Sequence, residues 1–259
     1  MAIFVRVSRL RRVNVAVSAN NESYGNVFGN QRIARGRQAT VTAVPASSIY
    51  KFDNWTVGGT VVSTAASYQF NAPIDGMILV ANFSANTVTI NVAATTKPNA
   101  FAGNTVSGGG VVAIGSPVTL TAATTDSTNY QFAGWYENNT LVSSNIAYTF
   151  TAFTNRNIEA RFGGKITITL NNRGTNNIII VLMNSQGANL TYLDYGVAQG
   201  SIQVFALTPL VLRYYIRTGG AVFVSWSLNG FNGPVLGTIN YFSFVPQEDM
   251  SIYAVFTNY

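Results

Sequence analysis

One aromatic pattern occurs three times in this chain of 259 residues and limits what the chain can fold into. Each copy begins with Phe-x-x-Trp, continues with an aromatic-x-Phe pair and ends with Ala-x-Phe. The last Phe follows the Trp by 28, 27 and 30 residues, and all three tryptophans belong to the pattern. Such spacing predicts a tandem array of one module in three copies. The residues are Phe52, Trp55 and Phe83, then Phe132, Trp135 and Phe162, then Phe223, Trp226 and Phe256.

We interpret these nine aromatic residues as the core of the repeat. Aromatic side chains bury large apolar areas, and a residue type kept at fixed spacing in every copy is typical of interior packing. The alternative is a surface role, in which the rings stack on sugars. If these residues form the core, the pattern indicates how many modules there are but gives little information about what the modules bind.

Alternating β-branched segments open each module and predict half-buried strands at residues 13–17, 88–92 and 166–170. A second strand is expected at 41–43 and at 120–122. In the third copy the corresponding glycine and alanine are Gly200 and Ala206. Residues 210–217 then have no counterpart in the other two copies, and we expect them to form a longer hairpin or an added strand. No segment has a sustained helical period, and Gly and Asn recur every few residues, so we predict an almost entirely β chain.

These elements divide the chain into a basic N-terminal arm at residues 1–12 and three modules at 13–84, 85–163 and 164–259. The junctions are only a few residues long, which predicts a fairly stiff array. The third module diverges from the other two and contains an insertion, as expected of a terminal repeat.

The order of these motifs resembles the divergent internalin-type B-repeat family of bacterial and phage surface proteins. The first module has Asn54 where the family has Gly, and the third keeps only the aromatic skeleton. The resemblance covers about residues 13–259 and implies small β-grasp-like or β-sandwich-like modules that serve as spacers, stalks or adhesion elements. The family has no shared catalytic residues, so the resemblance implies no catalytic site. The second module matches best, with Thr105-Val106, Gly115, Leu120-Thr121-Ala122, Tyr130-Gln131-Phe132-Ala133-Gly134-Trp135 and Ala160-Arg161-Phe162.

The composition excludes the commonest kinds of catalytic and metal-binding site. The chain has no Cys and no His, which excludes Ser-His and Cys-His nucleophile systems and the usual zinc ligands. Its nine carboxylates are scattered, and the one adjacent pair, Glu248-Asp249, falls in a predicted turn. Folding could bring two carboxylates together for glycoside hydrolysis, but nothing in the sequence selects a pair. We therefore expect a protein that is not an enzyme and uses no cofactor or metal.

The net charge of +6 is concentrated at the N-terminus, where residues 1–37 hold seven arginines and one glutamate. Arginine suits bidentate pairing with carboxylate or phosphate. Three interpretations compete: a solvated arm, an anchor that docks on an acidic partner protein by adding residues 3–7 as a strand, and a nucleic-acid contact. Nucleic acid is placed last because no aromatic residues are interleaved. The candidate anchoring residues are Arg6, Arg9, Arg11 and Arg12.

Four tyrosines outside the repeated pattern are candidates for an exposed interaction surface. All lie in the third module, where the chain departs most from the repeat. The alternative is that they too are structural. They are Tyr192, Tyr195, Tyr214 and Tyr215.

The sequence favours a non-enzymatic structural protein of a bacteriophage virion, such as a capsid decoration, head fibre or tail-associated element. Low charge, surface-type repeats, and the absence of a signal segment or an apolar stretch long enough for a membrane motivate this hypothesis. The chain would be made in the host cytoplasm, with other virion proteins and a host surface glycan as partners. The alternatives are a bacterial cell-surface adhesin or stalk fragment, and a carbohydrate-binding module.

Overall fold

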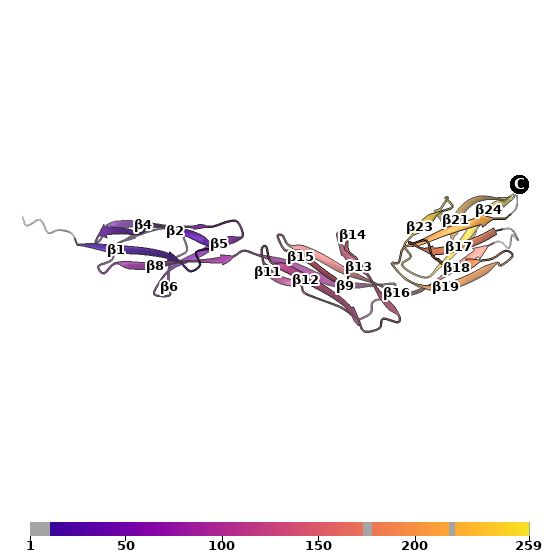
Figure 1. The fold of residues 1–259 in the computed structure, drawn as a ribbon, viewed down its shortest axis with the longest axis horizontal. Coiled ribbons are helices and arrows are strands. Elements are labelled where there is room, and N and C mark those ends of the chain that lie inside the picture. Colours follow the sequence, from indigo (N-terminus) through magenta and orange to yellow (C-terminus); the bar gives the residue numbers. More distant parts are fainter. Residues whose placement is uncertain (1–10, 173–177, 218–220, 259) are drawn as a thin grey trace, which may run out of the picture. The chain divides into compact units, whose positions relative to one another are not determined.

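A computed structural model describes residues 11–172, 178–217 and 221–258 of the chain (Figure 1). These residues form 24 strands and no helix, so the predicted all-β fold class is confirmed. No helix that could span a membrane occurs among them. The alternating segments that open the modules are strands, as expected. Arg6 and Arg9 lie outside the described residues.

The first module is a sandwich of two sheets that enclose one core (Figure 1). Val15, Val41, Trp55 and Leu79 come from both sheets and are buried against one another. The larger sheet has the order β3 (Gln31–Ala34), β1 (Arg12–Ala19), β8 (Met77–Ala85), β5 (Tyr50–Val57) and β6 (Thr60–Ser63). The smaller sheet has the order β2 (Gly25–Phe28), β4 (Gln38–Pro45) and β7 (Ser67–Asn71).

The second module repeats this plan. Its larger sheet contains β9 (Thr87–Lys97), β16 (Arg156–Asn172), β13 (Tyr130–Glu137) and β14 (Thr140–Ser143). Its smaller sheet has the order β10 (Asn104–Ser107), β12 (Pro117–Thr124) and β15 (Ala147–Thr151). The remaining strand is β11 (Gly110–Ala113).

The third module has five strands in its larger sheet and four in its smaller one. The larger sheet joins β19 (Gln199–Phe205), β16, β24 (Met250–Asn258), β21 (Ala221–Leu228) and β22 (Val235–Gly237). The smaller sheet has the order β18 (Asn189–Leu193), β17 (Ile178–Asn184), β20 (Leu210–Ile216) and β23 (Phe242–Phe244).

Strand β16 belongs to both the second and the third module. Residues 156–163 pair in parallel with β9, and residues 168–172 pair in parallel with β24. The predicted boundary between residues 163 and 164 therefore falls inside a continuous strand. A hydrogen-bonded strand of 17 residues is a stiff connection, since bending it would break ladder hydrogen bonds on both sides.

The Phe-x-x-Trp motif contains a β-bulge in every module. The register of pairing shifts between Phe52 and Asn54, between Phe132 and Gly134, and between Phe223 and Ser225. Residues three apart on a regular strand point to opposite faces, so Phe and Trp could not both reach the core without the extra residue. The bulge is the structural reason for the spacing of the motif.

The structure corrects the alignment of the third module. β19 pairs antiparallel with β16 as β3 pairs with β1, so the stretch that ends at Ala206 is not the counterpart of β4. That counterpart is β20, which pairs with β17 and β23 as β4 pairs with β2 and β7. The strand without an equivalent is β18, which pairs with β17 at the edge of the smaller sheet.

Contacts divide the chain into two compact units that do not coincide with the modules. The first unit contains the first module through Thr89 together with residues 111–117 and 151–155. Within it, the backbone N–H of Ile114 donates to the carbonyl of Asn86 at 2.9 Å, and that of Thr89 donates to Asn155 Oδ1 at 2.8 Å. The second unit contains the rest of the second module and all of the third, joined by β16.

Candidate functional site

The repeated aromatic residues fill the cores of the modules. All three tryptophans are fully buried, and Phe83 and Phe162 are nearly so. Each indole N–H donates to a backbone carbonyl: Trp55 to Ala66 at 3.3 Å, Trp135 to Asn145 at 3.0 Å and Trp226 to Ile239 at 3.0 Å. Buried rings with satisfied polar atoms are part of the fold and offer no stacking surface to a sugar. The remaining members, Phe52, Phe132, Phe223 and Phe256, are partly buried beside them in ring–ring contacts.

The four candidate tyrosines do not form one surface. Tyr214 points into the core of the third module, where its ring stacks on Phe223 at 4.5 Å, so its assignment to an exposed surface was wrong. Its neighbour Tyr215 points the other way, because successive strand residues face opposite sides of a sheet. Tyr192 lies on β18 and is 59% exposed. Tyr195 is half-buried beneath Arg217, whose guanidinium lies 5.1 Å from the ring centre.

The outer face of the smaller sheet in the third module is aromatic and carries one cation. Val181 lies between Tyr192 and Arg213 on neighbouring strands and is buried, although it faces away from the core. The guanidinium of Arg213 lies 4.2 Å from the ring centre of Tyr215 and 4.5 Å from that of Tyr241. Its buried Nε has no hydrogen-bond partner among the described residues. We call Tyr192, Arg213, Tyr215 and Tyr241 the tyrosine face.

Two of the four candidate anchoring arginines can be placed. Arg11 and Arg12 are exposed, and Arg12 is the first residue of β1, where it pairs with Ala34. The carbonyl of Arg11 accepts a hydrogen bond from the backbone N–H of Arg35 at 3.1 Å. These two arginines therefore lie at the start of β1, beside the end of β3.

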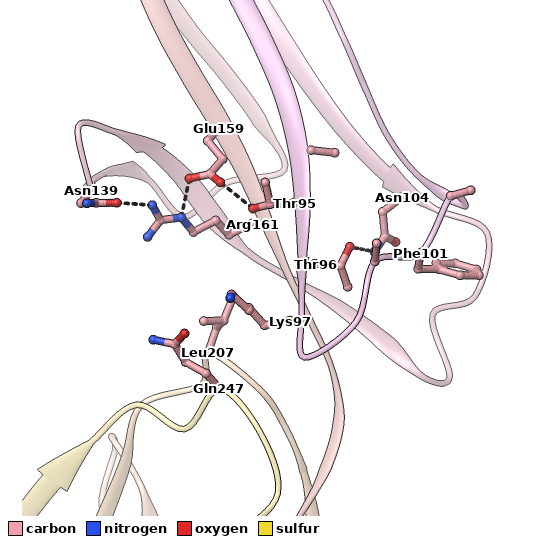
Figure 2. Close-up of a pocket in the computed structure, with 13 residues that line it drawn as sticks. Thr95, Thr96, Lys97, Phe101, Asn104, Asn139, Glu159, Arg161, Leu207 and Gln247 are labelled. Atoms are coloured by element: carbon pink, nitrogen blue, oxygen red, sulfur yellow. Dashed lines mark hydrogen bonds and ion pairs between the residues drawn. The ribbon is translucent and has the colours of Figure 1, made fainter.

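A hollow of about 980 Å³ lies where the second and third modules meet, within the second unit (Figure 2). Four of its polar side chains, Thr95, Lys97, Glu159 and Arg161, come from the outward faces of β9 and β16. Thr95 Oγ1 donates to Glu159 Oε1 at 2.7 Å, and Arg161 Nε donates to Glu159 Oε2 at 2.6 Å. The Arg161 guanidinium also donates to Asn139 Oδ1 and lies 4.2 Å from the ring centre of Tyr136. Three contacts therefore fix the position of this cation.

Glu159 is ionised in this network. Partial burial of the carboxyl favours its neutral form, but hydrogen bonds from Thr95 and Arg161, together with the positive charges of Arg161 and Lys97, outweigh that effect and lower the pKa of Glu159. The Glu159 carboxylate thus balances one of the two cations at the hollow, Arg161 and Lys97. Lys97 lines the hollow and forms no ion pair among the described residues.

A glycine on β16 shapes one wall of the hollow. A Cβ on Gly163 would lie 1.8 Å from the carbonyl oxygen of Ala206, so only glycine lets this backbone cross so closely. The backbone N–H of Ala206 donates to the carbonyl of Gly164 at 2.8 Å and fixes the crossing. The next residue, Leu207, then lines the hollow together with Gln247 (Figure 2).

The sequence alone did not identify this hollow. Thr95 and Glu159 are 64 residues apart, and they meet because β9 and β16 pair in parallel. Alternation of polar residues along 91–97 marks a solvent face, but it does not say which strand lies alongside. No group of three or more acidic side chains able to hold a metal ion is found in the described part of the chain.

Comparison with known proteins gives a family and several remote likenesses. The model of the divergent InlB B-repeat domain matches residues 15–87 and 94–166. No protein with a curated description matches the sequence. Solved structures with some likeness include the Bacillus anthracis TIE protein, at 9% identity and a TM-score of 0.29 over 95% of this chain and 50% of that one. The chain thus spans half the length of that protein.

Two pilus proteins are also similar in part. The minor pilin GBS52 of Streptococcus agalactiae has 6% identity and a TM-score of 0.28, over 96% of this chain and 97% of that one. The pilus adhesin SpaC of Lactobacillus rhamnosus GG has 9% identity and a TM-score of 0.24, over 96% and 44%. With TM-scores this low, the likenesses support no inference about function.

Proposed function

Because the chain belongs to the divergent InlB B-repeat family, we propose that it is a non-enzymatic, adhesin-like protein that displays β-modules at a bacterial cell surface. The observation that carries this proposal is the match of the family to two successive modules, over residues 15–87 and 94–166. The cell surface was the alternative to a virion in the prediction from sequence. It becomes the main proposal because the family match bears on surface repeats and gives no support to a phage particle.

The use of side chains within the modules supports a displaying role. The three tryptophans, the largest apolar side chains, are buried in the cores. The second and third modules share the continuous strand β16. Two sandwiches joined by one continuous strand are suited to holding a binding surface away from the body that carries it. Such a protein acts through its surfaces and not through a reactive centre.

The tyrosine face is the proposed contact surface of the third module. Tyrosine and arginine are enriched where proteins bind one another, since they combine apolar area with directional polar groups. Arg213 has no acidic partner among the described residues, so the complementary surface should carry a carboxylate. The arginines at positions 6, 9, 11 and 12 are proposed to anchor the other end of the chain on an acidic partner protein.

Localisation in the native host tests the proposal. An antibody against the third module should label intact cells, and an external protease should remove the label. Detection only after lysis would contradict surface display. Phage particles purified from the same culture provide the comparison: the chain in the particles and its absence from the cell surface would favour the virion hypothesis instead.

The anchoring role has its own test. A chain that lacks residues 1–12 should fold, since it keeps residues 13–19 of β1, but it should be released into the medium. Replacing Arg6, Arg9, Arg11 and Arg12 by Gln should release it as well. Unchanged retention of both variants would contradict the anchor.

A further inference from the structure

We propose that the hollow between the second and third modules binds a carboxylate-bearing sugar, with Arg161 and Lys97 as its cationic contacts. The proposal rests on the adhesin-like function and adds a ligand class and a site to it. Figure 2 shows the Arg161 guanidinium and the Lys97 side chain turned toward the same open space, with Gln247 and Leu207 beside it. The volume of about 980 Å³ lies within the range of roughly 300–1,000 Å³ typical of ligand sites.

The charges at the hollow favour an anion. Arg161 and Lys97 supply two positive charges, and Glu159 supplies one negative charge, which is held by Thr95 and Arg161. Arg161 uses its Nε for Glu159 and its Nη2 for Asn139, which leaves Nη1 without a hydrogen-bond partner among the described residues. Lys97 has no ion-pair partner there either. A carboxylate in the hollow would pair with both free donors.

The Arg161 guanidinium is already ordered before any ligand arrives. Glu159, Asn139 and the ring of Tyr136 hold it from three sides. A cation fixed in this way loses little side-chain freedom on binding, so more of the electrostatic attraction contributes to affinity.

The other groups at the hollow suit a sugar better than an acidic peptide. Asn139 and Gln247 offer amide groups, which can donate to and accept from sugar hydroxyls. A peptide would normally add to a free sheet edge, but β16 is paired on both sides by β9 and β13.

Titration calorimetry on the full chain at low salt tests the inference with matched pairs of probes. The pairs are 3′-sialyllactose with lactose, and trigalacturonate with maltotriose. At least one acidic sugar should bind, and about tenfold more tightly than its neutral partner, because the carboxylate supplies the contact to two cations. Failure of both acidic sugars to bind, or equal binding of the neutral ones, would overturn the proposal. So would equal or tighter binding of a hexaglutamate peptide.

Variants locate the site. Lys97→Gln and Arg161→Gln should each weaken binding of the acidic sugar by about tenfold, and the matched control Lys165→Gln should not, because it removes an exposed lysine of the same unit outside the hollow. Lys97 makes no ion pair among the described residues, so its variant should keep the fold even if Arg161→Gln does not. Equal weakening by Lys165→Gln would mean that the overall positive charge of the chain, and not the hollow, binds the acidic sugar, and would overturn the proposal. Because this assay uses purified protein, its result is independent of the localisation experiment.

Discussion

The indole N–H of Trp135 donates a hydrogen bond to the backbone carbonyl of Asn145 at 3.0 Å, while the ring is fully buried. The carbonyl lies in the loop between β14 and β15, so one side chain fixes both the core and the approach to the next strand. The same relationship recurs at Trp55 and Trp226. A tryptophan that satisfies a loop carbonyl and fills the core cannot be exchanged for another apolar residue without loss.

Replacing Trp135 should separate its two contributions. Trp135→Ala is expected to lower the free energy of unfolding by about 3–5 kcal/mol, since it leaves a large cavity. Trp135→Phe should cost roughly 1–3 kcal/mol, because it keeps an aromatic ring but leaves the loop carbonyl without its donor. Urea unfolding followed by circular dichroism measures both. Phe153→Ala, at a side chain 63% exposed, is the control and should stay within about 0.5 kcal/mol of the parent chain.

Two neighbouring glycines on β16 should respond differently to the same substitution. Gly163→Ala would place a Cβ 1.8 Å from the carbonyl oxygen of Ala206, and we expect it to cost at least about 2 kcal/mol. At Gly164 the nearest atom is 3.1 Å away, on the ring of Tyr130, so Gly164→Ala should cost about 1 kcal/mol or less. Thermal unfolding of the two variants makes the comparison. Equal costs would show that the chain does not cross closely at Gly163.

Adjacent tyrosines on β20 provide a test of which side faces the core. Tyr214→Ala removes a ring stacked on Phe223 and should cost about 3–5 kcal/mol. Tyr215→Ala removes a ring that is 41% exposed and should cost about 1 kcal/mol or less. Chemical denaturation of both variants decides the matter. A reversed order of costs would mean that the strand lies in the opposite register.

The ion pair between Glu137 and Arg156 should make stability depend on pH. A hydrogen bond from Arg156 lowers the pKa of Glu137 below the usual 4.5, although burial opposes this. Ionised Glu137 therefore stabilises the fold above its unfolded pKa, and that stabilisation is lost as the pH falls through the lower folded pKa. Glu137→Gln should cost about 1–2 kcal/mol at pH 7, and the difference should shrink below pH 4.5.

Urea titrations of the parent chain and Glu137→Gln at pH 7 and at pH 3 measure this difference. Glu248→Gln is the matched control, since Glu248 is exposed and forms no ion pair among the described residues. It should change stability at pH 7 by no more than about 0.5 kcal/mol. A cost for Glu137→Gln that stayed constant down to pH 3 would rule out the ionised pair as its source.

Much of the fold followed from local patterns. The alternating β-branched segments predicted the strands that open the modules, and the repeated aromatic residues predicted the module count and family. The third module was aligned wrongly around Ala206 because the aromatic skeleton there is not accompanied by the Gly and Thr-Ala signals of the other copies. Strand β20 could be recognised as the counterpart of β4 only from its pairing partners.

The candidate sites depended more strongly on tertiary structure. Tyr214 and Tyr215 are the same residue type and are adjacent in sequence, yet Tyr214 is packed against the core and Tyr215 lies on the tyrosine face. The hollow needs the parallel register of β9 with β16 and the close crossing at Gly163. Neither the register nor the crossing has a local signal.

The sequence by itself determined that the chain is β, that it repeats three times, and that its tryptophans belong to one recurring pattern. These properties are local, because strand periodicity and motif spacing depend on residues close together in the chain. The tertiary structure decided which strands lie side by side, where the bulge places Phe and Trp on one face, and which polar side chains meet at the hollow. Those outcomes depend on pairing between distant segments, and many registers are compatible with the same local pattern.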